Sequence, residues 1–134
     1  MSDNDASDTV ASDERLSRYI LQRNHIRKSD NTVKQDAFIP HPHEDLSVTR
    51  HLDLDQEAIW SIGEEVARQT GKNLYGRAEN LAATYLDQKL TVSSAPITGN
   101  PNHANVSGWP ADKPMQKMIA IEIAAKSRYV PRQG

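Results

Sequence analysis

The amino-acid sequence predicts an α+β fold, in which a small, mainly antiparallel sheet packs against two amphipathic helices. Short apolar–polar alternations, typical of half-buried strands, are separated by stretches rich in turn residues. Two longer segments, about 56–70 and 111–127, carry apolar residues at steps of three and four, which is the period of a helix. A chain of 134 residues with these elements is expected to form one domain.

The first fourteen residues, MSDNDASDTVASDE, are expected to be a disordered acidic tail (1–14) ahead of a single domain at 15–134, whose compact core spans about 37–127. They include one valine, five acids and no base, so they cannot bury enough apolar surface to offset their chain entropy. The whole chain carries −2 and the tail carries −5, which leaves +3 on the remainder. This excess permits an acidic partner, either a protein or a nucleic acid, and is also compatible with an ordinary solvated surface.

Before the first helix, the pattern predicts two strands. RLSRYILQR (15–23) fits either a helix or a strand, and KSDNTVKQD (28–36) is expected to be a loop. A short apolar strand at 37–39 ends at Pro40. The alternation in LSVTRH (46–51) predicts a half-buried strand with Leu46, Val48 and Arg50 on one face and Ser47, Thr49 and His51 on the other.

Capping residues bound both predicted helices. Asp55 is a good N-cap for the first helix, and Gly71 can adopt the left-handed conformation that ends it. Asp112 caps the second, and Pro114 suits its first turn. The expected buried stripe of the first helix is Ile59, Ile62 and Val66, and that of the second is Met115, Met118, Ile119 and Ile123.

Three further strands are expected at 74–79, 90–93 and 103–108. The last of these would direct Ala104 and Val106 into the core. Residues 81–86 fit either a short helix or an irregular strand, and 129–134 are expected to be a tail.

Composition excludes several classes of function. The chain has no cysteine, which removes disulfides, thiol nucleophiles and cysteine-ligated metal centres. It shows no signal peptide and no apolar run long enough to span a bilayer, so a cytoplasmic protein without membrane contact is expected. No phosphate-binding glycine loop or hydrolase signature is present, and no cofactor is expected.

The stretch HPHED offers weak candidates for a metal site, namely His41, His43 and Asp45. It resembles the start of the His-x-His-x-Asp-His ligand run of metallo-β-lactamase-like hydrolases, although Leu46 stands where that run has its closing histidine. A proline-stiffened loop whose histidines are exposed explains the same residues. We therefore expect no metal here.

Candidate catalytic residues are His103, Arg50 and His51, because the polar ends of 46–51 and 103–108 are expected to lie side by side. A histidine titrates near neutrality and suits a general base, while an inward arginine could hold a phosphate or carboxylate. Candidate binding residues are Asn105, Arg77 and Trp109. Each of these also has an ordinary explanation in turn geometry, packing or solvent exposure.

The segments DAFIP…DLSVTR and NPNHANVSGWPADK resemble those of small uncharacterised bacterial and phage proteins over roughly 37–127, which implies a bacterial origin and one compact domain.

Three functions stay open. The leading one is a non-enzymatic module that binds another macromolecule, because no complete catalytic set is visible. The alternatives are a small phosphodiesterase- or nuclease-like enzyme, as in a toxin or defence context, and a metal-binding protein built on the histidine loop.

Overall fold

The computed structural model describes residues 9–40 and 45–132. Within them, a six-stranded sheet has the order β6-β7-β4-β1-β5-β8, and every neighbouring pair is antiparallel. Its strands are β1 (Arg15–Ile20), β4 (Leu46–Arg50), β5 (Gly76–Leu81), β6 (Thr91–Ser94), β7 (His103–Ser107) and β8 (Arg128–Pro131). A separate two-stranded hairpin joins β2 (Ile26–Arg27) to β3 (Thr32–Val33). The predicted α+β class is confirmed.

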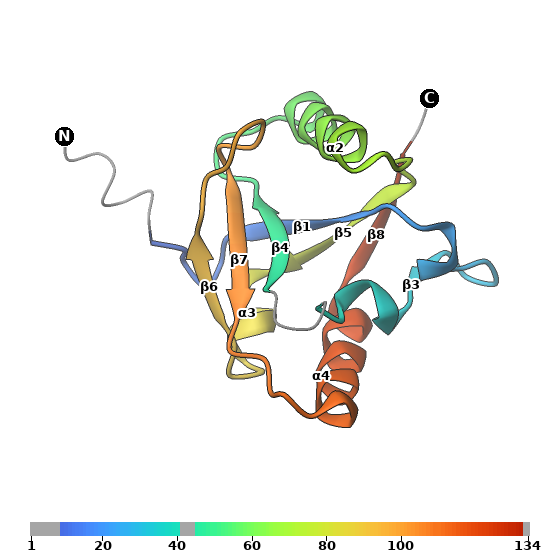
Figure 1. Cartoon of the computed structure of the whole chain (residues 1–134), viewed down its shortest axis with the longest axis vertical. Coiled ribbons are helices and arrows are strands. Elements are labelled where there is room, and N and C mark those ends of the chain that lie inside the picture. Colours follow the sequence, from blue (N-terminus) through green and yellow to red (C-terminus); the bar gives the residue numbers. More distant parts are fainter. Residues whose placement is uncertain (1–8, 41–44, 133–134) are drawn as a thin grey trace.

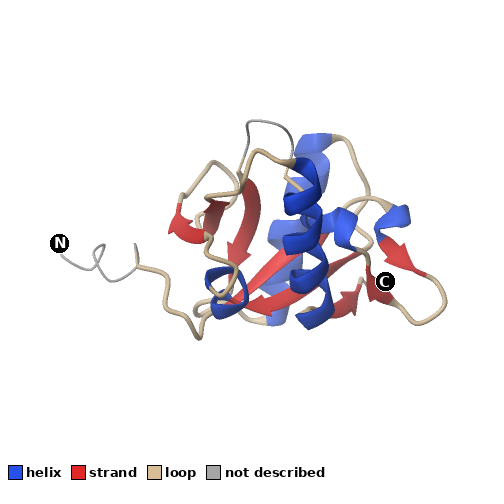
Figure 2. Ribbon diagram, turned by 90° about the horizontal axis from the view of Figure 1, so that it is seen from below, coloured by secondary structure: helices blue, strands red, loops and turns tan. Residues whose placement is uncertain are grey.

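The sheet lies between two groups of helices. Helix α2 (Gln56–Thr70) covers one face, and α4 (Lys113–Lys126) lies on the other side of the strands (Figures 1 and 2). The short helix α3 (Ala82–Leu86) and two 3-10 turns, η1 (Arg23–His25) and η2 (Gln35–Phe38), complete the described elements. The apolar core gathers side chains from β1, η2, β4, β5, α3, β7 and α4, including Leu16, Ile20, Phe38, Val106 and Ile123.

Helix α2 begins and ends where the sequence predicts. The amide of Ala58 donates to the Asp55 carboxylate at 2.8 Å, and Gly71 ends the helix with φ +68°. The buried face differs from the predicted stripe, because it comprises Ile59, Gly63 and Ala67 while Ile62 and Val66 are half-buried. Gly63 takes part because the ring of Tyr19 lies directly against it.

Helix α4 is capped as predicted, but its buried face is again different. The amide of Met115 donates to the Asp112 carboxylate at 3.2 Å, and Pro114 lies in the first turn. Ala120 and Ile123 are buried, whereas Met115 and Met118 are 52% and 67% exposed. The helix is apolar nearly all round, so periodicity alone could not identify the side that faces the core.

Two predicted elements differ from the structure, the predicted loop at 28–36 contains β3, and one open segment is decided. The predicted strand at 37–39 is the 3-10 turn η2, which buries Ala37 and Phe38, and Ile39 is extended before Pro40 as expected. The predicted C-terminal tail contains β8, which pairs with β5. Segment 15–23, which was open between helix and strand, contains β1, and β1 lies between β4 and β5 in the sheet. The core therefore extends beyond 37–127 on both sides.

The predicted acidic tail divides into two parts. Residues 1–8 lie outside the described residues, so the expectation of disorder stays a prediction there. Residues 9–14 contact the domain, and the carbonyl of Glu14 accepts a hydrogen bond from the amide of Ala82 at 2.8 Å. The boundary at residue 14 is therefore too late.

A membrane-spanning helix needs about 20 apolar residues, and no helix among residues 9–40 and 45–132 meets that requirement. The cytoplasmic location stays a prediction.

Candidate functional site

The two strands that carry the candidate catalytic residues are neighbours, as expected. Strand β4 pairs with β7 so that Thr49 lies opposite His103. Directly opposite residues share a sheet face and successive residues alternate, so His103 lies on the face of Thr49 while Arg50 points to the other face. The pairing is therefore confirmed, but a site that combines Arg50 with His103 is not present.

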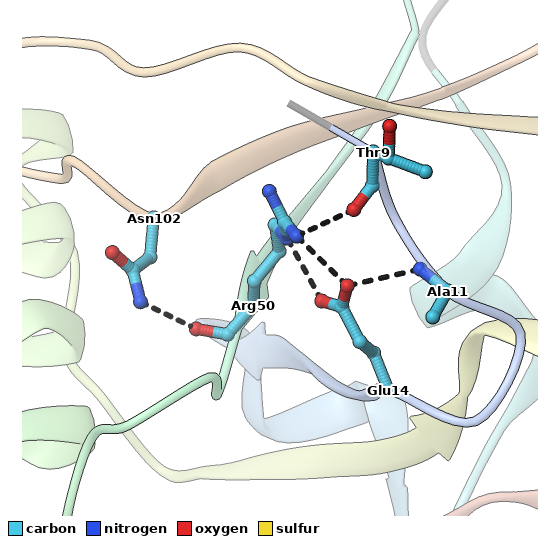
Figure 3. A network of polar contacts seen from close by, with 5 residues as sticks. All are labelled: Thr9, Ala11, Glu14, Arg50 and Asn102. Atoms are coloured by element: carbon cyan, nitrogen blue, oxygen red, sulfur yellow. Dashed lines mark hydrogen bonds and ion pairs between the residues drawn. The ribbon is translucent and has the colours of Figure 1, made fainter. Parts of the chain in front are cut away.

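Arg50 is a buried partner of Glu14. Its Nε and Nη2 atoms donate to the two carboxylate oxygens of Glu14, each at 2.8 Å, and Nη2 also donates to the carbonyl of Thr9 at 3.0 Å (Figure 3). The Glu14 carboxylate also accepts the amide of Ala11 at 2.9 Å. Asn102 donates to the carbonyl of Arg50 at 3.0 Å. The guanidinium, only 2% exposed, is engaged within the protein and is a poor candidate for a phosphate ligand.

His51 and His103 do not form a shared catalytic group. His51 Nε2 is hydrogen-bonded to Ser17 Oγ at 2.6 Å, whereas His103 Nδ1 lies 2.7 Å from the carbonyl oxygen of Ala95. Sequence reasoning missed the Ser17–His51 contact because the two residues are far apart in the chain. Ser17 is fully buried, so no substrate can reach its hydroxyl in this conformation.

The predicted binding residues Arg77, Asn105 and Trp109 lie within the folded domain, and their role in binding stays a prediction. Arg77 is buried and donates to the Glu79 carboxylate at 3.0 and 2.7 Å, and its guanidinium lies 4.4 Å from the ring centre of Trp60. Trp109 Nε1 donates to the carbonyl of Val106 at 3.0 Å. Asn105 is half-buried between its neighbours on β4 and β6.

The metal candidates His41 and His43 lie outside the described residues, and Asp45 is exposed at the start of β4. Within residues 9–40 and 45–132, no three histidine or acidic side chains are grouped closely enough to hold a metal ion. The expectation about the histidine loop therefore stays a prediction.

A cleft of about 790 Å³ opens where β1 leaves the sheet, between η2, the N-terminal part of α4 and the segment after α2. This volume is typical of ligand-binding clefts. Its lining includes four permanent cations, one carboxylate and one histidine: Arg18, Lys72, Lys113, Lys117, Asp36 and His25.

Arg18 is the cation that lines the cleft from β1. It lies on the core face of β1, and its Nε and Nη1 atoms donate to the carbonyls of Ala37 and Ser47 at 2.9 and 3.0 Å. Burial lowers the pKa of Arg18, an effect opposed by the nearby hydroxyl of Tyr85. Both hydrogen bonds described for Arg18 go to neutral carbonyls, so no carboxylate among the described residues bonds to its charge.

His25 lies among the charged residues of the cleft, and its pKa is lowered mainly by burial. Burial lowers the pKa of His25; Asp36 opposes this effect, and Arg18, Lys72 and Lys34 add to it. The imidazole is therefore expected to be neutral at pH 7, because its pKa lies below the ordinary value of 6.5.

Sequence reasoning did not identify this cleft, because nothing local in the sequence links Arg18 with Lys72 or with α4. One signal was available, since Lys113 and Lys117 are four residues apart in a capped helix and must share one side of it.

Comparison with protein-family models, with curated proteins and with solved structures gave no match for this chain. The bacterial or phage origin implied by the sequence resemblance therefore stays a prediction.

Proposed function

We propose that this protein is a non-enzymatic binding module that takes an acidic segment of a partner protein into the cleft around Arg18. The observation that carries the proposal is the concentration of Arg18, Lys72, Lys113 and Lys117 around one concave surface, where Asp36 is the single acid among residues 9–40 and 45–132. A cleft lined by one sign of charge raises the local concentration of oppositely charged ligands.

The position of Lys113 supports this proposal. Lys113 is the first residue of α4, whose first turn contains no acid. A base at a helix N-terminus is unfavourable by about 0.3–1 kcal/mol, because the helix dipole is positive there. Asp112 at the N-cap offsets part of this cost, and Lys113 itself lines the cleft, which is consistent with a role in binding.

The enzyme alternative has less support. Each of its three candidate residues is engaged elsewhere, since Arg50 is paired with Glu14, His51 with Ser17 and His103 with a carbonyl. The metal-binding alternative rests on His41 and His43, and no geometry in the described residues favours it.

The proposal is tested with a labelled oligoglutamate peptide and fluorescence anisotropy. The double substitution Lys113→Gln/Lys117→Gln should weaken binding by roughly two- to thirtyfold, because two exposed ion pairs contribute about 0.2–1 kcal/mol each. The matched control, Lys28→Gln/Lys126→Gln, removes the same charge from exposed positions outside the cleft. Equal losses in both variants would show that net charge, and not the cleft, attracts the peptide.

A further inference from the structure

The cleft offers more positive charge than one carboxylate can neutralise. Among the residues that the structure describes, four permanent cations face one acid, Asp36, and His25 adds no charge when it is neutral. A side-chain carboxylate carries one negative charge, whereas a phosphate monoester carries about −1.5 to −2 at neutral pH and presents three acceptor oxygens. The charge balance therefore favours a doubly charged group.

The way Arg18 is held also favours a phosphate. Two of its nitrogens are fixed by the carbonyls of Ala37 and Ser47, so the plane of the guanidinium is set before a ligand arrives. A fixed planar fork matches the geometry of phosphate oxygens, and little side-chain entropy is lost on binding. Lys113 and Lys117 supply point charges from one wall, and Lys72 supplies another.

The remaining lining distinguishes a peptide from a nucleic acid. It is largely aliphatic, with Leu21, Ile39, Pro40 and Ala111, and Tyr19 is the only aromatic residue among those described there. The Tyr19 hydroxyl donates to the carbonyl of Ile59, and its ring lies against Gly63. Single-stranded nucleic acids are usually held by stacking of bases on exposed aromatic rings, and the described residues of this cleft provide no such platform.

We propose that the cleft around Arg18 recognises a phosphorylated side chain of a partner protein, with the phosphate at Arg18 and the lysines and the adjoining peptide on the aliphatic wall. This inference rests on the proposed function, because it names the acidic group that the binding module prefers.

The experiment compares three degenerate peptide pools that are identical except for a fixed central residue, which is serine, glutamate or phosphoserine. Binding of each pool to the full chain is measured by fluorescence anisotropy at one salt concentration. The phosphoserine pool should bind at least about tenfold more tightly than the glutamate pool, because hydrogen bonds to charged groups contribute about 1.5–3 kcal/mol. Inorganic phosphate should compete with it.

The other outcomes separate this inference from the proposed function. Equal binding of the glutamate and phosphoserine pools, both above serine, would overturn the phosphate preference and leave the acidic-peptide function in place. No binding above the serine pool would overturn both. Tighter binding of an oligothymidylate than of the phosphoserine pool would overturn both in favour of a nucleic acid.

The variant Arg18→Lys provides a second test. Lysine keeps the positive charge but lacks the planar fork, so the preference for phosphoserine over glutamate should fall while glutamate binding changes little. The thermal midpoint of this variant is measured in parallel, because Arg18 also bonds to Ala37 and Ser47. An unchanged preference in a folded variant would contradict the role assigned to Arg18.

Discussion

At the residue scale, the buried arginines show how one polar side chain connects distant parts of the chain. An arginine on the core face of a strand needs a partner, because an unpaired buried charge is very unfavourable. Arg50 finds that partner in Glu14, a residue that composition alone assigned to a disordered tail. Arg77 finds Glu79 two residues along its own strand. The alternation of apolar residues indicated that Arg50 points inward, but only the fold identified its partner.

We predict that Glu14→Gln destabilises the protein by about 3–5 kcal/mol, the usual cost of removing one member of a buried ion pair. Burial alone would raise the pKa of Glu14, but hydrogen bonds from Arg50 and Ala11 and the charge of Arg50 bring it below the ordinary 4.5. The stability from this pair is therefore complete above about pH 4.5 and lost as pH falls through the folded-state pKa. Urea unfolding at several pH values measures both effects.

The control for this prediction is Glu122→Gln, which changes an exposed acid on α4. It should alter the free energy of unfolding by less than about 0.5 kcal/mol, as surface substitutions usually do. Similar losses in both variants would contradict a specific role for the Glu14–Arg50 pair.

We predict that His51 makes the protein less stable in mild acid. Burial lowers the pKa of His51; Glu79 opposes this effect, and Arg77 and Arg15 add to it. With a folded-state pKa below the ordinary 6.5, the unfolded state binds the proton first as pH falls. Stability should therefore fall from about pH 6.5 down to the folded-state pKa.

A variant and a direct titration both test this prediction. On acidification, His51→Asn should lose less unfolding free energy than the unsubstituted protein does. His25→Asn is measured beside it, because His25 also has a lowered pKa and its contribution must be separated from that of His51. Imidazole signals followed by NMR give the pKa of His51 directly. A value at or above 6.5 would contradict the burial of this ring.

At the element scale, α2 packs unusually closely on the sheet at Gly63. A Cβ atom built at Gly63 would lie 2.6 Å from a ring carbon of Tyr19. That ring cannot easily move, because its hydroxyl donates to the carbonyl of Ile59, and burial raises the pKa of Tyr19 to about 12, so the donor proton is retained. The glycine thus sets the distance between α2 and β1.

We predict that Gly63→Ala destabilises the protein by about 1–3 kcal/mol, the usual cost of overpacking. In an unrestricted helix the same change would stabilise by roughly 0.5–1 kcal/mol. The control is Ser61→Ala, at an exposed position of the same helix, which should change stability by less than about 0.5 kcal/mol. Thermal and urea unfolding measure both, and a stabilised Gly63→Ala would show that α2 packs more loosely.

The sequence predicted correctly the helix ends, which depend on residues close together in the chain. The caps Asp55, Gly71 and Asp112 fixed the helix ends, since each acts within one turn of the backbone. Strand β1 could not be recognised, because Arg18 replaces an apolar residue on its core face and Ser17 is a buried polar residue on the other. Strand β8 was missed because a short edge strand shows little alternation.

The candidate site was less predictable than the fold. Its cations come from β1, the segment after α2, and α4, and they meet only because of the sheet order. The histidines that stand out in the sequence are poor guides, since His51 and His103 are engaged in separate hydrogen bonds. Histidines are easy to notice in a sequence because they are few. A charged cleft forms instead from common lysine and arginine residues that come together only in the folded chain.

At the scale of the whole molecule, the charge is unevenly distributed. The chain carries −2 in total, and residues 1–8 contain Asp3, Asp5 and Asp8 without a base. The basic cleft is lined by residues between Arg18 and Lys117. An acidic segment attached to the same chain repels an acidic ligand and also competes with it for the cleft, and both effects are screened by salt.

We predict that deletion of residues 1–8 increases the affinity for the oligoglutamate peptide by roughly two- to fivefold at low salt, in line with the energies of exposed charge interactions. The gain should disappear near 1 M salt, where the Debye length is about 3 Å. Fluorescence anisotropy across a salt series measures this, and the unfolding free energy should not change because Glu14 is retained.

A charge-only variant, Asp3→Asn/Asp5→Asn/Asp8→Asn, should reproduce the effect of the deletion. If the deletion increases affinity and this variant does not, the segment blocks the cleft by its bulk; if neither does, the segment does not influence binding.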